Sequence, residues 1–385
     1  MSIFDNIGPA TSKSVISTDD AYLHARRRLP KIIFDFIEGA AGREQATDRN
    51  QKRFDNIILQ PRVMGDVAQR SLETSFLGRS YSVPFGIAPM GMCNLAWPHA
   101  DKHLARVAQQ AGMPVCLSTA GSSTIEDMYG WGGENTWFQL YVTQSTDMAL
   151  ELVERARIAG YDTLILTVDV PEVSRRIRDL RNGFKAPFHI GPKQAFDFAT
   201  HPRWSLSTML AGAPSPRNFE TDGKQTKFDR NASRAGADWA FLDRLRKIWK
   251  GRLIIKGITE PSDAVRVKEA GADAIYVSNH GGRQLDSAPA TIDILPLIRA
   301  AVGPDYPLIF DSGVRNGDDI IKALAYGADF VMLGRPFMFA LGADAEKGVR
   351  SLVRVLADEI SVSMAQIGVN NIASLTNDVV VKTEQ

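Results

Sequence analysis

A short apolar run followed by a helical pattern recurs along most of the chain, and this alternation constrains the fold more than any other feature. Each run is continuously apolar, as expected of parallel strands that are covered on both faces. Helical patterns such as 147–160 and 261–271 lie between the runs. The eight predicted strands are VPFGIAP (83–89), MPVCLS (113–118), TWFQLYV (136–142), DTLILTVD (162–169), RLIIKG (252–257), DAIYVSN (273–279), PLIFDSG (307–313) and DFVMLGR (329–335).

Eight strands that alternate with helices favour a closed (β/α)8 TIM barrel over an open doubly wound sheet. No GxGxxG sequence follows the first strand, whereas the glycine- and arginine-containing segments 311–317 and 334–336 follow the last two strands. A barrel commonly binds phosphate at that place. The echoes AGYD (159–162), AGAD (270–273) and YGAD (326–329) predict glycine caps where helices lead into strands.

The chain is expected to form one domain of 385 residues in three parts. Residues 1–80 are expected to form a helical extension, with helices at 19–29 and 30–40, that caps the bottom of the barrel and reaches its rim. The barrel itself is expected to span 83–340, and a helix with a tail to span 344–385.

One interval breaks the regular alternation, because about 65 residues separate Asp169 from the next helical pattern near Asp238. Such a long loop in a compact domain is usually functional or disordered, so 182–235 is predicted to be a partly mobile lid. Apolar and basic residues mix in it, which suits either contact with a membrane surface or cover for the active site. These residues are Phe188, Ile190, Phe196, Phe198, Trp204, Met209 and Leu210, with Lys185, Lys193 and Arg203.

Composition excludes several classes of function. Lys and Arg number 45 against 44 Asp and Glu, which leaves no basic excess for nucleic acid. No apolar run is long enough to span a membrane, and the start of the chain lacks a secretory signal pattern. The only cysteines are Cys93 and Cys116, and no Cys/His cluster has the spacing of a zinc site. A cytoplasmic enzyme without a metal is therefore expected.

Every predicted strand delivers polar or otherwise distinctive residues at its carboxyl end, where barrels carry their active sites. From the first half these are Pro89, Met90, Gly91, Ser118, Gln139, Tyr141, Thr167 and Asp169. From the second half they are Lys256, Ser278, Asn279, His280, Asp311, Gly334 and Arg335.

His280, in SNHGGRQLD, is the strongest candidate for a catalytic base. A lone histidine is more often structural, but Arg283 follows three residues later and Asp169 ends another strand. Imidazole suits proton abstraction at neutral pH, and a carboxylate stabilises the imidazolium that forms. Arg176 and Arg283 are candidates for gripping a carboxylate, although the arginine-rich RRIRDLR around Arg176 equally suits a solvated helix.

Lys256 ends a very apolar strand and needs an anionic partner, which leaves a substrate, a Schiff base or an electron-rich cofactor ring as alternatives. The segments DSGVRNG and GRP offer backbone N–H groups and arginines at helix starts, as an anion such as a cofactor phosphate requires.

With these motifs the chain resembles the FMN-dependent α-hydroxy-acid dehydrogenase/oxidase family, which includes glycolate oxidase, mandelate dehydrogenase and flavin-type lactate dehydrogenase. The likeness runs from LPKIIFDFIEGAA to MAQIG through WFQLYV, LTVDVP, IIKG, SNHGGRQLD, DSGVRNG and LGRP. HPRWSL (201–206) is most similar to the mandelate and lactate dehydrogenase branch.

The resemblance implies that His280 is the base and that Asp169 orients it. It implies that Arg283 and Arg176 bind the substrate carboxylate and that Tyr141 donates to the hydroxyl oxygen. The α-hydrogen would leave as hydride to flavin N5 while His280 takes the hydroxyl proton. Abstraction of the α-proton to form a carbanion would use the same residues. The residues implied to hold FMN are Pro89, Met90, Gly91, Ser118, Gln139, Thr167, Lys256, Ser278, Asp311, Ser312, Gly313, Val314, Arg315, Gly334 and Arg335.

Two departures from the family pattern bear on specificity, and a third position bears on the electron acceptor. Phe36 stands where a carboxylate-binding tyrosine is usual, and Ala120 stands where glycolate oxidases have tryptophan. Both predict a bulky, mandelate- or lactate-like 2-hydroxy acid. Gly91, where oxidases tend to carry alanine, favours a dehydrogenase.

The electron acceptor, whether oxygen, a quinone or a cytochrome, stays open, and the resemblance implies a homotetramer. Two other functions stay open beside the 2-hydroxy-acid oxidoreductase. They are a non-redox FMN enzyme of isomerase type and a flavin-binding protein without catalysis.

Overall fold

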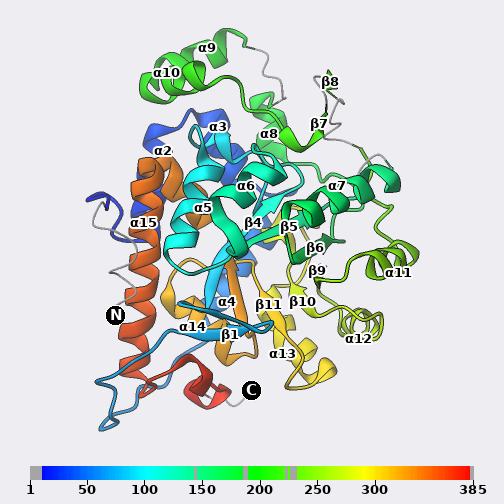
Figure 1. Cartoon of the computed structure of the whole chain (residues 1–385). Coiled ribbons are helices and arrows are strands. Elements are labelled where there is room, and N and C mark those ends of the chain that lie inside the picture. The colour runs from blue at the N-terminus through cyan, green and yellow to red at the C-terminus, as the bar shows by residue number, and fades with distance from the viewer. Residues whose placement is uncertain (1–10, 143–144, 185–189, 222–223, 226–231, 382–385) are drawn as a thin grey trace.

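The computed structural model describes residues 11–142, 145–184, 190–221, 224–225 and 232–381. Its centre is a closed barrel of parallel strands in the order β10-β11-β12-β3-β4-β5-β6-β9, in which β9 also pairs with β10 (Figure 1). All eight predicted strands form, and they follow one another around the barrel in the order of the sequence. They are β3 (Phe85–Met90), β4 (Val115–Ser118), β5 (Thr136–Leu140), β6 (Thr163–Thr167), β9 (Arg252–Ile258), β10 (Ala274–Val277), β11 (Leu308–Phe310) and β12 (Phe330–Leu333).

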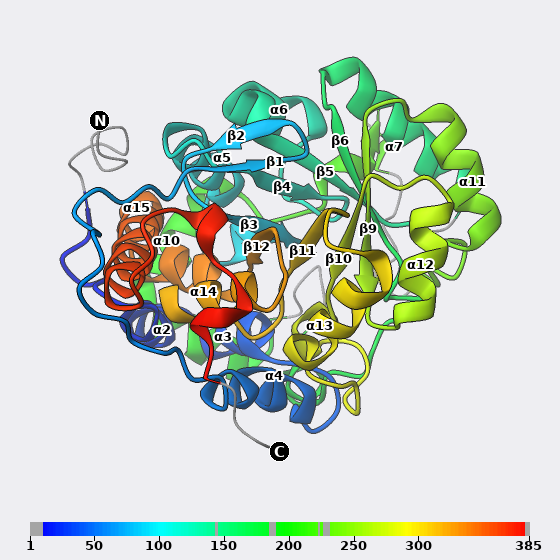
Figure 2. The same cartoon turned by 90° about the horizontal axis from the view of Figure 1, so that it is seen from below.

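Helices surround the barrel and pack their apolar faces on its outer wall (Figures 1 and 2). Several start at a side-chain cap, as where Ser145 accepts the N–H of Met148 and Asn316 accepts that of Asp319. The helices are α5 (Ala100–Gln110), α6 (Ile125–Gly132), α7 (Thr146–Ala159), α11 (Trp239–Ile248), α12 (Pro261–Glu269), α13 (Thr291–Val302), α14 (Gly317–Ala325) and α15 (Arg335–Gln366). Short 3-10 turns are η1 (Cys93–Leu95), η2 (Gly133–Asn135), η4 (His280–Gly282), η5 (Ile372–Ser374) and η6 (Asn377–Val379).

The three predicted glycine caps adopt the left-handed conformation that glycine tolerates without steric cost. Gly160, Gly271 and Gly327 have φ angles of 100°, 78° and 106°. Each turns the chain from the end of a helix towards the following strand.

The N-terminal region contains α2 (Thr18–Arg28), α3 (Lys31–Glu38) and α4 (Gln45–Asp55). The helices predicted at 19–29 and 30–40 correspond to α2 and α3. α2 lies along α15, and α3 reaches the rim at the carboxyl ends of the strands (Figure 1).

The bottom of the barrel is closed by a hairpin of β1 (Thr74–Phe76) and β2 (Arg79–Tyr81) rather than by these helices (Figure 2). Phe76 and Tyr81 lie 5.3 and 5.4 Å, between ring centroids, from Phe330, which starts β12. This hairpin was not predicted from the sequence.

The C-terminal helix begins earlier than predicted, because α15 starts at Arg335 and not at residue 344. Its backbone breaks at Asp344 and Ala345, where the φ angles are −158° and 48°. The predicted boundary therefore coincides with this break inside α15.

The interval between β6 and β9 holds regular elements rather than an irregular loop. They are α8 (Ile177–Asn182), α9 (Pro192–Ala199), α10 (Pro202–Ala211), η3 (Arg217–Phe219) and a hairpin of β7 (Glu220–Thr221) and β8 (Lys224–Gln225). α9 and α10 lie beyond the carboxyl ends of the strands, at the top of Figure 1. Lys185 and Phe188, which the sequence analysis named, lie outside the described residues.

Candidate active site

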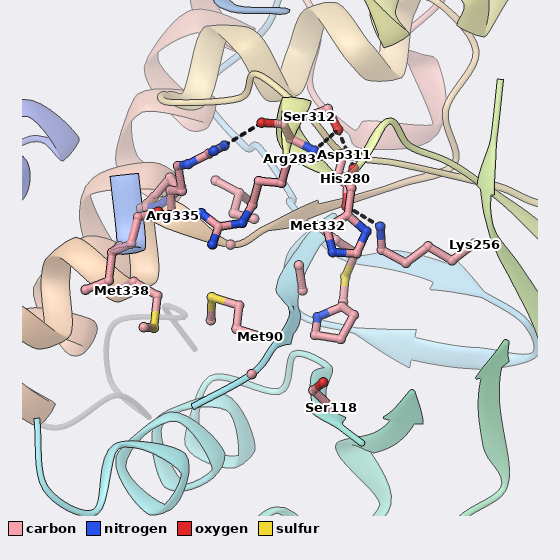
Figure 3. A pocket seen from close by; sticks show the side chains of 18 of the residues that line it. Met90, Ser118, Lys256, His280, Arg283, Asp311, Ser312, Met332, Arg335 and Met338 are labelled. Carbon is pink, nitrogen blue, oxygen red and sulfur yellow. Dashed lines mark hydrogen bonds and ion pairs between the residues drawn. The ribbon is translucent and has the colours of Figure 1, made fainter. Parts of the chain in front are cut away.

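A cavity of about 240 Å³ opens at the carboxyl ends of the barrel strands (Figure 3). Most of the site residues named from the sequence line it. They are Phe36, Pro89, Met90, Gly91, Ser118, Ala120, Tyr141, Arg176, Lys256, His280, Arg283, Asp311, Ser312, Gly313, Val314, Arg315, Gly334 and Arg335.

The remaining named residues do not line the cavity and lie behind its wall. They are Asp169, Gln139, Thr167, Ser278 and Asn279. Gln139 accepts a hydrogen bond from Ser118 Oγ at 2.9 Å and donates one to Thr167 Oγ1 at 3.0 Å. This buried chain fixes the hydroxyl of Ser118 at the wall. The structure thus brings the named residues together, some as lining and some as support.

His280 lies between a carboxylate and a phenol. Its Nδ1 is 3.1 Å from Asp169 Oδ1, and its Nε2 is 3.3 Å from the phenol oxygen of Tyr141. A carboxylate accepts hydrogen bonds, so the contact with Asp169 puts the proton on Nδ1 and leaves the Nε2 lone pair towards Tyr141 and the cavity. Nε2 is therefore the atom able to accept a proton.

The backbone around His280 takes a conformation that the neighbouring glycines permit. His280 has a φ angle of 59°, and Gly281 and Gly282 have φ angles of 63° and 75°. A Cβ at Gly282 would meet the backbone N of Thr47 at 2.5 Å, so only glycine fits there. Strained, tightly packed backbone of this kind often holds a functional side chain in place.

Opposing effects act on the pKa of His280. Burial lowers it most, the Asp169 carboxylate raises it, and the Lys256 and Arg176 cations lower it further, so the pKa of His280 lies below the ordinary value. The imidazole is therefore neutral at neutral pH and able to act as a base.

Lys256 lies near the carboxyl end of β9, close to groups that follow β10 and β11. Its Nζ donates to Ser278 Oγ at 2.6 Å and lies 3.1 Å from the Asp311 carboxylate. Burial would raise the pKa of Asp311, but the Lys256 ammonium and hydrogen bonds outweigh it, and that pKa is lowered. The ion pair keeps a fixed cation in the cavity wall.

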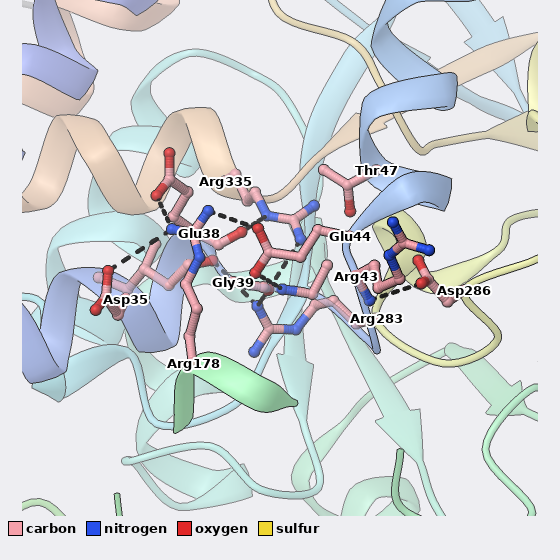
Figure 4. A network of polar contacts seen from close by, with 12 residues as sticks. Asp35, Glu38, Gly39, Arg43, Glu44, Thr47, Arg178, Arg283, Asp286 and Arg335 are labelled. Atoms are coloured by element: carbon pink, nitrogen blue, oxygen red, sulfur yellow. Dashed lines mark hydrogen bonds and ion pairs between the residues drawn. The ribbon is translucent and has the colours of Figure 1, made fainter. Parts of the chain in front are cut away.

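Arg283 and Arg335 meet at the carboxyl end of α3, a contact that sequence reasoning missed. Arg283 donates to the carbonyl oxygens of Phe36, Ile37 and Gly39 at 3.0, 3.1 and 2.6 Å. Arg335 donates to Gly39 at 3.2 Å (Figure 4). The carboxyl end of α3 thus positions Arg283 near His280 and Arg335 near the last two strands.

The same helix end is tied to the segment that carries Arg176. Arg178 forms ion pairs with Glu38 and, at 2.5 Å, with Glu44 (Figure 4). Phe184 stacks on Phe36 with ring centroids 4.5 Å apart. The start of the interval after β6 is therefore fastened over Phe36.

Sequence reasoning missed several lining residues, of which Arg234 is the only one in the described part of 182–235. The others are Ile37, Ala88, Met92, Gly281, Met332, Leu333, Pro336 and Met338. Most of them are next to a named residue in the sequence, so the same positions at strand ends could have identified them. Arg234 follows no strand and had no such signal.

Comparison with known proteins decides the family. Residues 25–382 match the family model described as FMN-dependent dehydrogenase. (S)-mandelate dehydrogenase of Pseudomonas putida is 38% identical over 95% of this chain and 94% of its own, and L-lactate dehydrogenase of Pseudomonas syringae pv. syringae is 36% identical over 96% and 99%. The chain belongs to the FMN-dependent dehydrogenase family.

A solved structure of this family supports the same assignment at the level of the fold. A crystal structure described as the monotopic membrane protein (S)-mandelate dehydrogenase has a TM-score of 0.92 and 38% identity, and the alignment covers 96% of this chain and all of that one.

The residues present fit FMN, the cofactor of this family. Burial and the neighbouring Arg315 and Arg176 guanidiniums lower the pKa of Arg335 to about 9, and burial lowers that of Arg315 to about 10. Two cations held together in this way are a suitable site for a phosphate dianion. The Lys256 cation lies apart from them along the wall, where an electron-rich ring can approach it.

Proposed function

We propose that the enzyme oxidises an L-2-hydroxy acid to the 2-oxo acid, with His280 as the base. The observation that carries this proposal is the imidazole held between Asp169 and Tyr141 at the cavity wall. Bound FMN would supply the acceptor for the two electrons. A non-redox FMN enzyme would not require this base together with Arg176 and Arg283.

In the proposed mechanism, Arg176 and Arg283 bind the substrate carboxylate, and the phenol O–H of Tyr141 donates a hydrogen bond to the hydroxyl oxygen. His280 Nε2 takes the hydroxyl proton while the α-hydrogen leaves with its electron pair. Asp169 then stabilises the imidazolium. Transfer of the α-hydrogen to His280 as a proton would use the same side chains.

For the cofactor we propose that Arg315, Arg335 and the backbone of 311–314 and Gly334 hold the phosphate and ribityl chain. Lys256 would face the ring edge that becomes anionic on reduction. Pro89, Met90, Gly91, Ser118, Gln139, Thr167 and Ser278 would contact or support the ring system.

We infer that the substrate is bulky and apolar or aromatic. Ala120 and Phe36 line the cavity, and a Cβ at Gly91 would lie 3.2 Å from that of Ala120. A small side chain at 120 leaves space for a large substituent, and burying that substituent is worth about 25 cal/mol per Å².

We propose a dehydrogenase that reacts slowly with oxygen and passes electrons to a quinone or cytochrome. Gly91 supports this because oxidases of the family tend to carry alanine at that position. Two relatives of the chain are also named dehydrogenases. We also propose a homotetramer.

We further propose a cytoplasmic protein bound peripherally to the inner face of the membrane. Within the described residues, no helix is both long and apolar enough to cross a bilayer. Phe196, Met209 and Leu210 on α9 and α10 are 73%, 72% and 85% exposed. Such residues suit interfacial binding, and none of them lines the cavity.

Trp204 is an exception that corrects the sequence-based set. It is 3% exposed and donates its indole N–H to the carbonyl of Leu95 at 2.8 Å. It therefore anchors α10 to the body of the protein and cannot contact lipid.

The test is a panel of 2-hydroxy acids added anaerobically to the FMN-bound enzyme, scored first by bleaching of the flavin and then by reoxidation in air. Bleaching by aryl or long-chain acids with slow reoxidation would support the proposal. A protein that cannot be prepared with FMN, or that none of the acids bleaches, would refute it.

A further inference from the structure

Arg234 enters the active site from the end of the long interval after β6. It lines the cavity, is 8% exposed, and its guanidinium carbon lies 4.9 Å from the centroid of the Tyr141 ring. Its backbone N–H donates to the carbonyl of Pro171 at 2.9 Å, close to the end of β6. The side chain is thus held at the cavity by the loop that also carries Asp169.

Tyr141 is fixed from three directions. Its backbone N–H donates to Thr119 Oγ1 at 2.9 Å, its phenol oxygen lies 3.3 Å from His280 Nε2, and Arg234 covers its ring face. Burial and the Asp169 charge raise the pKa of the phenol, and Arg234 opposes them more strongly than Arg176 or Arg283 does.

A cation over a phenol ring is attracted by the π electrons, and the attraction reaches about 2 kcal/mol where both groups are desolvated. It draws electron density from the ring, which makes the phenol O–H a stronger hydrogen-bond donor. That effect matters most when negative charge develops on the oxygen that accepts the bond.

We propose that Arg234 is a positioning residue that holds the Tyr141 ring and strengthens its phenol as a donor to the substrate oxygen. This inference rests on the proposed function, in which that oxygen becomes an alkoxide as His280 takes its proton. In this role Arg234 acts through Tyr141 and not on the reacting atoms.

The test is a double-mutant cycle in the FMN-bound enzyme, with the rate of anaerobic flavin reduction by a bulky 2-hydroxy acid as the readout. R234M is expected to lower the limiting rate about five- to thirtyfold with little change in KM. R234K should retain most of the rate. In the Y141F background, adding R234M should lower the limiting rate by less than a further twofold.

R266M is the matched control, because Arg266 also stacks on an aromatic ring, that of Trp239 at 3.8 Å, but does not line the cavity. The flavin of the R266M variant should be reduced by the substrate at the wild-type rate. R234Q replaces R234M if the latter does not retain FMN.

Three results would each overturn the inference. The first is a rate in the double variant that falls by the product of the two single losses. The others are a normal rate in R234M and a raised KM at an unchanged rate. A raised KM at an unchanged rate would mean that Arg234 binds the substrate directly, for example through a second anionic group of the substrate. Wild-type enzyme that no 2-hydroxy acid reduces would instead overturn the proposed function, and this inference with it.

Discussion

His280 owes its properties as a base to neighbours that are distant in the sequence. Asp169 follows β6 and Tyr141 follows β5, yet both lie within 3.3 Å of the imidazole. Their positions after barrel strands made them predictable, because all parallel strands of a barrel end at the same rim.

The pKa of His280 predicts how the rate of flavin reduction depends on pH. Because burial lowers it, kcat/KM should hold as pH falls to about 6.5, the ordinary histidine value, and decline only below that. In D169N the raising effect of the carboxylate is lost, so the decline should move to lower pH and the rate should fall about 10²–10⁴-fold. A decline that begins above pH 6.5 in the wild type would contradict this assignment.

The cavity wall at Ala120 and Phe36 predicts specificity. A120W should abolish turnover of aryl 2-hydroxy acids, because indole would fill the space beside Gly91. F36Y should improve the binding of small hydroxy acids by about 0.5–1.5 kcal/mol through one added hydrogen bond. Steady-state kinetics with glycolate, lactate and aryl acids check both variants. A wild-type kcat/KM that is highest for glycolate or lactate would show that the pocket is not built for bulk.

Some residues of the site left no signal in the sequence. Gly39 acts through its carbonyl oxygen, which accepts from both Arg283 and Arg335, and any residue type carries such an oxygen. Arg234 stands in a segment without hydrophobic periodicity, so its return to the cavity depends on tertiary contacts alone.

At the scale of elements, α3 links the interval after β6 to the site. The N-cap residue of α3, Pro30, provides no side-chain hydrogen bond to the start of the helix. Instead Asp197 of α9 accepts the N–H groups of Lys31 and Ile32 at 3.1 and 3.3 Å. The other end of α3 holds Arg283 (Figure 4).

Removing this cap should destabilise the protein measurably. D197A is expected to lower the free energy of unfolding by about 1 kcal/mol, since capping carboxylates are typically worth 0.5–2 kcal/mol, while D197N should lose less. Denaturant unfolding of the FMN-bound enzyme gives the measurement, with the exposed Asp305→Ala as control. Equal stability of D197A and the wild type would show that the cap contributes nothing.

The strands were predictable because parallel strands covered on both faces are continuously apolar, as LIIKG and TLILT are. The hairpin of β1 and β2 was not, because strands of three residues are too short to show alternation. α9 and α10 were not, since their apolar residues face both the protein and the outside, which obscures a helical period.

At the scale of the whole molecule, the barrel has a closed bottom and an open top. The hairpin covers the amino ends of the strands, and the cavity, α3 and the exposed faces of α9 and α10 lie at the carboxyl ends (Figures 1 and 2).

This polarity predicts that membrane contact does not disturb chemistry. The double variant F196D/L210D should lose flotation with anionic liposomes and keep its rate of flavin reduction, because neither side chain lines the cavity. L297D, at another exposed leucine on α13, should float as the wild type does. If the double variant floats unchanged, α9 and α10 are not the membrane-binding surface.

The central claim is tested most directly by anaerobic single-turnover reduction of the bound FMN with an aryl 2-hydroxy acid, in wild type and H280A. H103A is the matched control, because His103 also pairs with a carboxylate, Glu346 at 2.9 Å, away from the cavity. The wild type and H103A should bleach alike, while H280A should retain FMN and bleach about 10²–10⁴-fold more slowly. Bleaching of H280A at the wild-type rate would contradict the account, because the base would then lie elsewhere.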